Sequence, residues 1–531
     1  MTSQAYLLRV GSIKEQLSKY SHLSVLNFTL RHMNEKPKDP LHINANMPWV
    51  VMFMLKVSML GPNGSEEITQ REFIRIANQI FHLQGKAADL SSENIELSLR
   101  AMILSQMLYQ KDMLNGLRDL FVQGSLFTRS DNYYDDIFFK VFGLSLDSYL
   151  QMSMFVAVRI EAQLDKGIIK MPLSELLFYM CPKIPYSHLL AFIRLVSCSA
   201  ADLAGFIEGH DLGGIFASEY FQETPFKYIP FILEGSELVA FNYRFCITAM
   251  CGLAPAVLKK EFPAFKNQFG ADMESRVGEL LGVLEYDCFM CESDLQELLR
   301  SEGIAGKVVD YVVREGDQVT LVECKAVEPT DLMKCTADAG ILKRGLEQNY
   351  IKAIHQGQAV ADALAGLPQF EGCSFRLLVV TYGDHYIFGG KFISDNIDKC
   401  LLGDISKTYG ELPMPLDKVS YLALQDFAGL IYGLKEKGRL LGAFLDAACD
   451  AQESPQTRRM SLAHVVEDDL GVVSGSFAAG LEAEMDRKSA ALQTLLSENT
   501  RHWNGKAEHF MKMHGSLMQA LNPSYQDINF G

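Results

Sequence analysis

The sequence predicts an α/β core, in which helices flank a mixed sheet, set between a large α-helical N-terminal region and an α-helical C-terminal region. Three patterns predict this fold class. Apolar residues at helical spacing dominate residues 1–224, short β-branched runs mix with helices over residues 271–400, and helical patterns return over residues 401–531. A β-hairpin and a helical connector are expected between the first two regions, over residues 225–270.

Length and composition describe a folded protein of several domains. The chain has 531 residues, more than one hydrophobic core usually organises, and 48% of them are hydrophobic and 21% charged. The formal net charge of −16 gives no global basic field that would attract nucleic acid or an anionic membrane. Any polyanion that binds must therefore be held locally.

Neither a membrane span nor a secretory signal is predicted. The most apolar stretch, residues 48–60, is 13 residues long and contains Lys56, whereas a span needs about 20 apolar residues. It predicts a buried helix instead. Residues 1–16 lack the charged and then apolar order of a secretory signal, so we expect a cytoplasmic protein without a membrane partner.

The eleven cysteines are spread along the chain, which predicts reduced, buried thiols. Cys288 and Cys291 form a CxxC pair with no second such pair after it. Cys246 and Cys251 would have to complete a tetrathiolate zinc site, but their spacing from the pair matches no common zinc ribbon. A structural zinc is not expected.

Local patterns place several helices outside the core. Thr69 and Glu72 have the spacing of a capping box and open a helix with an apolar face. Further amphipathic helices are expected over residues 95–109, 150–164 and 477–502. These helices are typical of packing or self-association surfaces.

The segment GKVVDYVVREGDQVTLVECKAVE is expected to form a β-hairpin. Its two strand-like runs, residues 308–313 and 319–322, flank a turn that contains Gly316. Asp310 lies six residues before this glycine and Glu323 seven residues after it. Antiparallel pairing therefore brings the two acids to about the same level.

Charged side chains gather at the end of these two apolar strands. Side chains alternate along a strand, so Glu323 and Lys325 share one face while Val322 and Cys324 point to the other. Because an unpaired buried charge is costly, the group predicts either a functional centre or a salt bridge of Lys325 with Glu323 or Asp310.

The run VVDYVV followed by VECKA resembles the PD-(D/E)xK nuclease superfamily, whose restriction-endonuclease-like fold carries an Asp and then Glu-x-Lys. Val309 stands where that family has its Pro. The resemblance covers residues 274–381 and implies the order helix, three strands, helix, strand. The matching segments are residues 271–284, 286–291, 308–313, 319–326, 346–364 and 375–381.

What the resemblance implies is a metal-dependent endonuclease. Asp310, Glu323 and the backbone carbonyl of Cys324 are the implied ligands of Mg²⁺ or Mn²⁺, ions that prefer hard oxygen atoms. Lys325 is implied to orient the attacking water or to stabilise the charge that develops on the phosphate. Glu274 is implied to hold a second ion through water.

Two site residues on helices require a choice between neighbours. Glu274 falls at the edge of the apolar face of its helix, whereas Glu279 points nearly opposite, so Glu274 is the expected site residue. On the later helix, Gln356 and Gln358 flank opposite edges of an apolar stripe. We assign Gln356 to the site, as support for the lysine or the phosphate.

The charge of this region calls for a local source of nucleic-acid binding. Residues 271–360 carry nine Lys and Arg against seventeen Asp and Glu, a net charge of −8. The four basic residues expected to contact nucleic acid, or else to form a solvated helix face, are Lys334, Lys343, Arg344 and Lys352. Without them, assembly, a partner or a trigger must deliver the substrate.

The functional expectation is an endonuclease that cuts DNA rather than RNA. The resemblance implies a role in prokaryotic restriction or antiphage defence, with helical regions that form a homo-oligomer or bind a partner protein. The alternative is a catalytically silent nuclease-like fold that acts as a nucleic-acid-binding or protein-scaffolding module.

Overall fold

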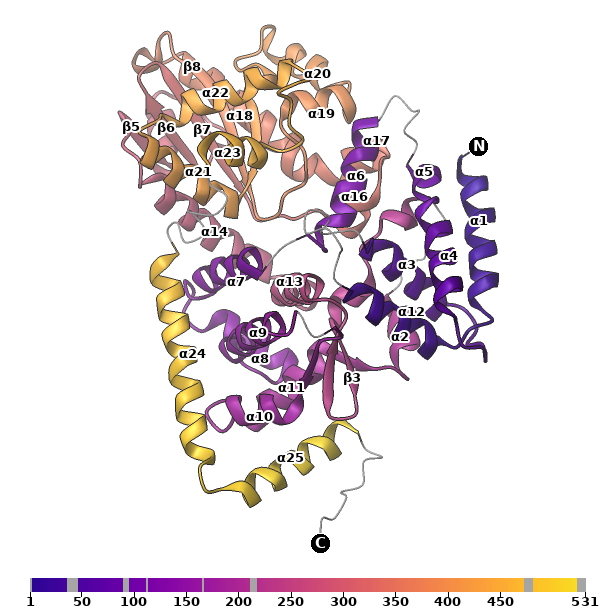
Figure 1. Cartoon of the computed structure of the whole chain (residues 1–531). Helices are drawn as coiled ribbons and strands as arrows, with labels where there is room; N and C mark the ends of the chain where they lie inside the picture. The colour runs from indigo at the N-terminus through magenta and orange to yellow at the C-terminus, as the bar shows by residue number, and fades with distance from the viewer. Residues whose placement is uncertain are drawn as a thin grey trace. The chain divides into compact units, whose positions relative to one another are not determined.

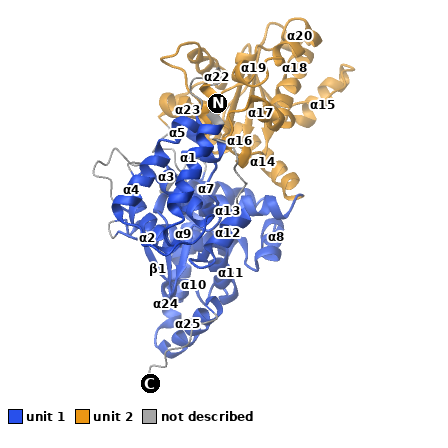
Figure 2. Cartoon of the chain, turned by 90° about the vertical axis from the view of Figure 1, so that its right-hand side faces the viewer, with its two compact units in different colours: residues 1–89, 102–263, 481–531 blue, residues 90–101, 264–480 orange. Residues whose placement is uncertain are grey.

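The computed structural model describes residues 2–35, 46–88, 95–110, 113–164, 167–210, 217–471 and 481–522. The chain forms two compact units (Figure 2). Unit 1 comprises residues 1–89, 102–263 and 481–531, and unit 2 comprises residues 90–101 and 264–480. Each unit combines helices with a small mixed sheet, so the predicted mixed α/β class is confirmed.

Unit 1 is mostly helical. Its helices, with α6 divided between the two units, are α1 (Thr2–Leu17), α2 (His22–Met33), α3 (Pro48–Met59), α4 (Gln70–Phe81), α5 (Gln84–Ala87), α6 (Ile95–Met107), α7 (Met113–Phe127), α8 (Tyr133–Phe142), α9 (Leu146–Glu161), α10 (Leu173–Met180), α11 (Tyr186–Val196), α12 (Leu203–His210), α13 (Tyr243–Glu261), α24 (Glu482–Trp503) and α25 (Ala507–Leu521). The predicted capping box is present, because Thr69 and Glu72 each accept a hydrogen bond from the other's backbone amide.

The apolar stretch around Lys56 forms the buried helix α3, as predicted. Of the helix predicted over residues 477–502, residues 477–480 lie outside the described residues.

The sheet of unit 1 has four short strands in the order β1-β4-β3-β2. The strands are β1 (Lys170–Pro172), β2 (Ser197–Ser199), β3 (Phe231–Glu234) and β4 (Glu237–Ala240). β3 and β4 pair antiparallel around Gly235, whose φ of +56° favours glycine, so the hairpin predicted after residue 225 is confirmed.

Among the described residues, we find no single helix with both the length and the apolar composition that crossing a membrane requires. α8 and α9 meet that requirement only as a pair, and the chain bends by 78° between them.

Unit 2 contains a five-stranded mixed sheet in the order β5-β6-β7-β8-β9 (Figure 1). The strands are β5 (Cys288–Cys291), β6 (Tyr311–Glu315), β7 (Gln318–Lys325), β8 (Ser374–Thr381) and β9 (Val419–Ala423). β5, β6 and β7 pair antiparallel, whereas β7, β8 and β9 pair parallel. The helices are α14 (Phe265–Leu281), α15 (Glu292–Ser301), α16 (Asp331–Cys335), α17 (Ala339–Leu346), α18 (Lys352–Ala365), α19 (Gly390–Asn396), α20 (Leu401–Tyr409), α21 (Leu424–Lys437), α22 (Leu441–Asp450) and α23 (Leu462–Leu470).

Helices cover both faces of this sheet. α17 to α20 pack with one face in a shared apolar core, while α14 and α21 to α23 lie against the other face (Figure 1). Gly357 lets α18 approach the sheet closely, since a Cβ atom there would lie 2.8 Å from Leu377 of β8. This close packing fixes the helix that carries Gln356.

The central hairpin differs from its prediction in where the first strand begins. β6 starts at Tyr311 rather than at Val308, and a two-residue turn at Gly316, with φ of +65°, joins it to β7. The physical reason lies in side chains: the backbone carbonyl of Val308 accepts from Gln356, and Asp310 accepts from the backbone of β7. Side-chain hydrogen bonds thus replace the start of the ladder.

The C-terminal region requires a correction. Residues 401–531 were expected to be helical, but Val419–Ala423 form β9 and extend the sheet. All five residues of β9 are buried, so its apolar run could not be separated from a buried helix by periodicity. The boundary expected at residue 400 consequently falls inside unit 2, which continues to residue 480.

The cysteines are free, but fewer are buried than predicted. Five of the eleven are buried, five are partly exposed, and Cys400 is exposed. Cys288 and Cys291 lie in β5 of unit 2, whereas Cys246 and Cys251 lie in α13 of unit 1.

Candidate metal centre

The β6–β7 hairpin brings Asp310 to Glu323, as predicted. Tyr311 pairs with Val322, so Asp310, which precedes Tyr311, lies opposite Glu323, which follows Val322. The Asp310 carboxylate accepts a hydrogen bond of 2.5 Å from the backbone amide of Cys324. This contact ties the acid to the end of β7.

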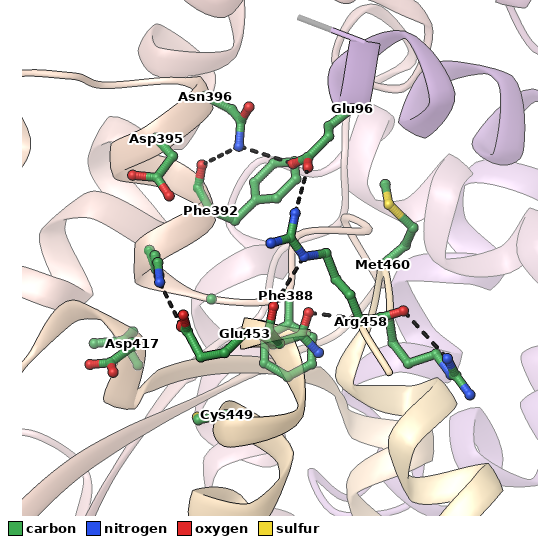
Figure 3. Close-up of a pocket in the computed structure, with 15 residues that line it drawn as sticks. Glu96, Phe388, Phe392, Asp395, Asn396, Asp417, Cys449, Glu453, Arg458 and Met460 are labelled. Atoms are coloured by element: carbon green, nitrogen blue, oxygen red, sulfur yellow. Dashed lines mark hydrogen bonds and ion pairs between the residues drawn. The ribbon is translucent and has the colours of Figure 1, made fainter. Parts of the chain in front are cut away.

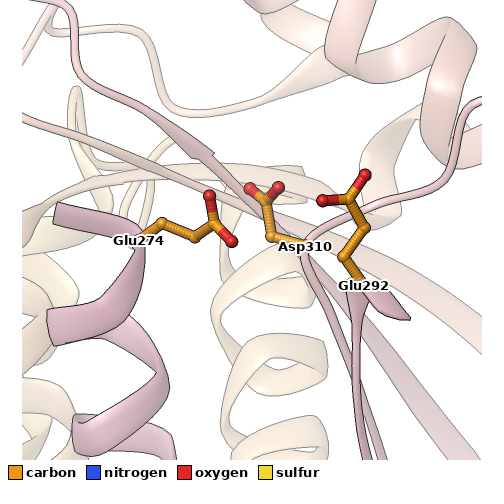
Figure 4. A group of neighbouring side chains, drawn as sticks. All are labelled: Glu274, Glu292 and Asp310. Carbon is orange, nitrogen blue, oxygen red and sulfur yellow. The ribbon is translucent and has the colours of Figure 1, made fainter. Parts of the chain in front are cut away.

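Three carboxylates from three different elements converge beside the hairpin (Figure 4). Glu274 comes from α14, Glu292 begins α15, and Asp310 precedes β6. Each offers a carboxylate oxygen within 4.8 Å of those of the other two. Oxygen atoms at this separation can share one divalent cation.

Local contacts position Glu274. The hydroxyl of Tyr311 donates to the backbone carbonyl of Glu274 at 3.0 Å, which fixes α14 against β6. Gly278, one turn further along α14, makes this approach possible, because a Cβ atom there would lie 2.4 Å from the Tyr311 hydroxyl oxygen. The helix therefore presents Glu274 at a defined height beside Asp310.

Glu292 is the site residue that the sequence analysis missed. α15 starts at Glu292 because Asp294 caps the helix, accepting from the Cys291 amide at 3.1 Å. Cys291 pairs with Tyr311, so one step along the same register places Glu292 opposite Asp310. Antiparallel pairing of the first predicted strand with the hairpin was the signal that could have found it.

Glu323 lies next to the three carboxylates but faces other partners. Its side chain is 2% exposed, forms an ion pair with Lys325 and accepts from Gln356 Nε2 at 3.2 Å. The salt bridge between Lys325 and Glu323, one of the two predicted outcomes, is therefore present. It places the ammonium group at the edge of the acidic cluster.

The pKa values of the acids report a concentration of negative charge. Burial, together with the neighbouring Asp310 and Glu292, raises the pKa of Glu274 to about 7, and Lys325 opposes this rise. Burial also raises the pKa of Glu323 to about 7, with a contribution from Asp310 that Lys325 opposes. The pKa of Asp310 is raised by burial, against the hydrogen bond from the Cys324 amide. A cation among these groups would relieve their repulsion.

The structure separates the residues between which the sequence analysis chose. Gln356 reaches Glu323, whereas the fully buried Gln358 bonds to the backbone of Met414 at 2.6 Å and 3.1 Å. Glu279 is exposed and pairs with Arg276 at 3.3 Å. Gln356 and Glu274 are therefore the members of the two pairs that lie at the acidic group, and their roles in a site stay predictions.

The four basic residues expected to bind nucleic acid lie on α16, α17 and α18. Lys343 forms an ion pair with Asp398 at 2.9 Å, so its charge is compensated within the protein. Arg344 and Lys352 are exposed, and Lys334 is partly buried. Arg344 and Lys352 thus keep the exposure that a contact with a phosphate backbone requires.

A pocket elsewhere in unit 2 contains none of these acids in its lining (Figure 3). Its volume is about 180 Å³, and two ion pairs stand at it: Arg458 with Glu96 at 3.2 Å, and Lys391 with Glu453 at 2.6 Å. Because these charges compensate each other, the pocket presents a weaker chemical signal than the carboxylate cluster.

Comparison of the chain with protein-family models, with curated proteins and with solved structures found no match. The functional proposal therefore rests on the residues and their geometry.

Proposed function

We propose that the carboxylate cluster is the metal centre of a nuclease that hydrolyses phosphodiester bonds with Mg²⁺ or Mn²⁺. One observation carries the proposal: the β6–β7 hairpin gathers Asp310, Glu323 and Lys325 at a point that Glu274 reaches from α14. Acids in such a group at the end of buried strands have no evident role in stability, because their mutual repulsion raises their pKa values.

The arrangement of elements supports a restriction-endonuclease-like core. α14, β5, β6, β7, α18 and β8 follow one another in the order that the PD-(D/E)xK resemblance implies. α15 to α17 are additions between these elements. The sheet is mixed, with the hairpin beside a parallel strand reached through α18.

The residues present fit a hard divalent cation. Glu274, Glu292 and Asp310 offer carboxylate oxygens, the donor type that Mg²⁺ and Mn²⁺ prefer. When bound, such an ion polarises the scissile phosphate and lowers the pKa of a bound water. Glu323 and Gln356 would hold Lys325 beside this centre, where its ammonium group can stabilise negative charge on the phosphate.

The substrate we propose is DNA, in a cytoplasmic role such as prokaryotic restriction or antiphage defence. The resemblance is the basis for DNA and for the role. The acidity of residues 271–360 favours an enzyme that acts after assembly or after binding a partner protein through its helical regions, since phosphate backbones are otherwise repelled.

Cleavage assays on the full chain test the proposal. Plasmid DNA and a matched RNA are incubated with Mg²⁺ or Mn²⁺, and with EDTA as the metal-free control. We expect DNA cleavage that EDTA, Asp310→Asn and Lys325→Ala abolish, while Glu279→Gln, an exposed acid on the same helix as Glu274, retains it. Absence of cleavage of both polymers with both ions, in monomeric and assembled fractions alike, would contradict the proposal.

The Lys325–Glu323 ion pair also suits the alternative, a silent centre that serves a binding or scaffolding module. Metal titration separates the two functions. The scaffold function is supported if the wild-type protein binds no metal, and if wild type and Asp310→Asn bind nucleic acid or a protein partner with equal affinity.

A further inference from the structure

The pocket of unit 2 (Figure 3) has a lining that mixes apolar and charged side chains. Its volume is about 180 Å³. A cavity of about 150 Å³ takes a benzene molecule, so this pocket has room for a small organic group. None of the acids of the carboxylate cluster lies in the lining, so a ligand of this pocket would be separate from the candidate metal centre.

Two neighbouring elements carry acids of this lining. Asp395 lies in α19, and Asp417 lies in the 3-10 helix η5 (Leu416–Lys418). α19 begins directly against η5 because Gly390 has no side chain, and a Cβ atom there would lie 2.7 Å from the backbone carbonyl oxygen of Leu416. The separation of the two elements that carry the acids is therefore fixed by close backbone packing.

Each basic side chain of the lining already has a carboxylate partner. The pairs are Lys391 with Glu453 at 2.6 Å, Arg458 with Glu96 at 3.2 Å, and Arg459 with Asp468 at 2.7 Å. An added anion would have to compete with these carboxylates for the same cations. The pocket therefore does not favour an anionic ligand.

Asp395 and Asp417 are the acids that these pairs leave over. Both are exposed, and in the part of the chain that the structure describes neither side chain forms a hydrogen bond or an ion pair. The pKa of Lys391 is raised, first by its hydrogen bond to Glu453 and, among other charges, by Asp395 and Asp417, while burial opposes the rise. Figure 3 shows Asp395, Asp417 and Glu453 on one side of the pocket and Arg458 on the other. This side thus has three carboxylates around one ammonium group.

The spacing of these acids suits an organic cation better than a metal ion. Among the described residues, the group whose carboxylates come close enough to share one ion is that of Glu274, Glu292 and Asp310, and none of its members lines the pocket. An ammonium or guanidinium group has several N–H donors that point in different directions, so it can reach carboxylates that lie further apart. Phe388 and Phe392 of the same lining offer aromatic surface to such a cation.

Gln452 adds a hydrogen-bond donor to the lining. Its side-chain oxygen accepts from the backbone amide of Arg459 at 3.4 Å, which leaves its side-chain nitrogen. This nitrogen is buried and has no hydrogen-bond partner among the described residues. Because buried polar groups are nearly always hydrogen-bonded in folded proteins, the amide calls for an acceptor atom from a ligand.

We propose that this pocket binds a small organic cation, an ammonium or guanidinium compound that also carries a hydrogen-bond acceptor. Asp395 and Asp417 hold its positive group, Phe388 and Phe392 contact its carbon chain, and Gln452 donates to its acceptor. The proposal does not depend on the nuclease function, since the lining shares no residue with the carboxylate cluster.

Thermal unfolding of the full chain, titrated with one small molecule at a time, tests this site. The probes are arginine and lysine, which carry a guanidinium or an ammonium group and a carboxylate as the acceptor. Their uncharged counterparts, citrulline and norleucine, are the controls, and EDTA is present throughout at constant ionic strength. A ligand that binds only the folded state raises the unfolding temperature in a saturable way. We expect this for at least one of the two cations and for neither control.

Variants of exposed acids locate the binding. Asp395→Asn and Asp417→Asn should each weaken the affinity for the active cation about fivefold, as expected for an ion pair near the surface, and the double variant should abolish the saturable response. Asp362→Asn, which changes an exposed aspartate of α18 outside the lining, is the matched control and should keep the wild-type affinity. Asp310→Asn should keep it as well, because the cation does not bind at the carboxylate cluster.

Calorimetric titration of the wild-type chain with the same four compounds provides a readout that needs no variant. The proposal is overturned if neither cation gives a saturable response in either measurement, or if citrulline and norleucine bind as tightly as the cations. It is also overturned if the double variant keeps the wild-type affinity. Loss of the affinity in Asp310→Asn would place the cation at the carboxylate cluster and equally overturn it.

Discussion

Two groups of buried polar side chains in this protein differ in their balance of charge. The candidate metal centre of unit 2 gathers acceptors, because Glu274, Glu292 and Asp310 bring their carboxylates together and the amine of Lys325 lies beside them. In unit 1, Lys56 and Glu219 form a buried ion pair of one amine and one carboxylate. The first group therefore calls for a cation, whereas the pair in unit 1 is neutral as a whole.

This difference shows why the balance of donors and acceptors is more informative than burial alone. Both groups include side chains that are almost fully buried, such as Glu323 and Lys56. Only the balance of partners distinguishes a candidate cation site from a neutral buried ion pair.

The largest effect is expected from breaking the buried pair in unit 1. Lys56→Met leaves the Glu219 carboxylate buried without this cation and should cost about 3–5 kcal/mol of unfolding free energy. Urea unfolding measures this cost. The double variant Lys56→Met/Glu219→Gln should recover most of this loss of unfolding free energy. If Lys56→Met alone stays within about 1 kcal/mol of wild type, the two residues do not act as a buried charge pair.

A metal ion should stabilise the acidic centre by the next largest amount. At an ion concentration of about 100 times Kd, Mn²⁺ is expected to add about 2.7 kcal/mol to the unfolding free energy. Asp310→Asn should lose this gain and, without metal, be more stable than wild type, because the variant removes a charge that burial disfavours. Equal stabilisation of wild type and variant in thermal unfolding would place the ion elsewhere.

Glu292→Gln sharpens the assignment of the third carboxylate. The variant should weaken Mn²⁺ binding roughly tenfold, the lower end of what a supporting group contributes to a metal site. Glu279→Gln, also an exposed glutamate, is the control and should have no effect. If calorimetry shows the same affinity for both variants, Glu292 belongs to the solvated surface.

A pH dependence of the metal-free protein is a further expected effect. The pKa of Glu274 and that of Glu323 are raised to about 7 in the folded state, above an unfolded value of about 4.3. The folded state therefore holds more protons between these values, and these two groups make stability fall as pH rises from about 4.3 to 7. Glu274→Gln should flatten this slope in chemical unfolding, and an unchanged slope would remove Glu274 from the buried cluster.

The hairpin and its acids could be predicted because their geometry is local. A two-residue turn at Gly316 fixes the register of β6 and β7, and the register fixes the position of Asp310 relative to Cys324 and Glu323. The choice of Glu274 followed from helical periodicity in the same way. In both cases the residues are close in sequence, so their relative positions follow from strand pairing or helix geometry alone.

The features that the sequence did not predict depend on tertiary contacts, which no local sequence pattern encodes. Glu292 joins the cluster through the pairing of β5 with β6, and the buried ion pair of unit 1 joins Lys56 to the distant Glu219. β9 was missed because a short buried strand and a buried helix segment share the same apolar composition.

The most direct test of the central claim is Mn²⁺ binding to the full chain, followed by electron paramagnetic resonance at pH 8, above the raised pKa values of Glu274 and Glu323. Saturable binding that Asp310→Asn weakens and Glu279→Gln leaves unchanged is the result that the carboxylate cluster predicts. Free Mn²⁺ at every protein concentration, or the same affinity in Asp310→Asn as in wild type, would contradict a metal centre at this hairpin.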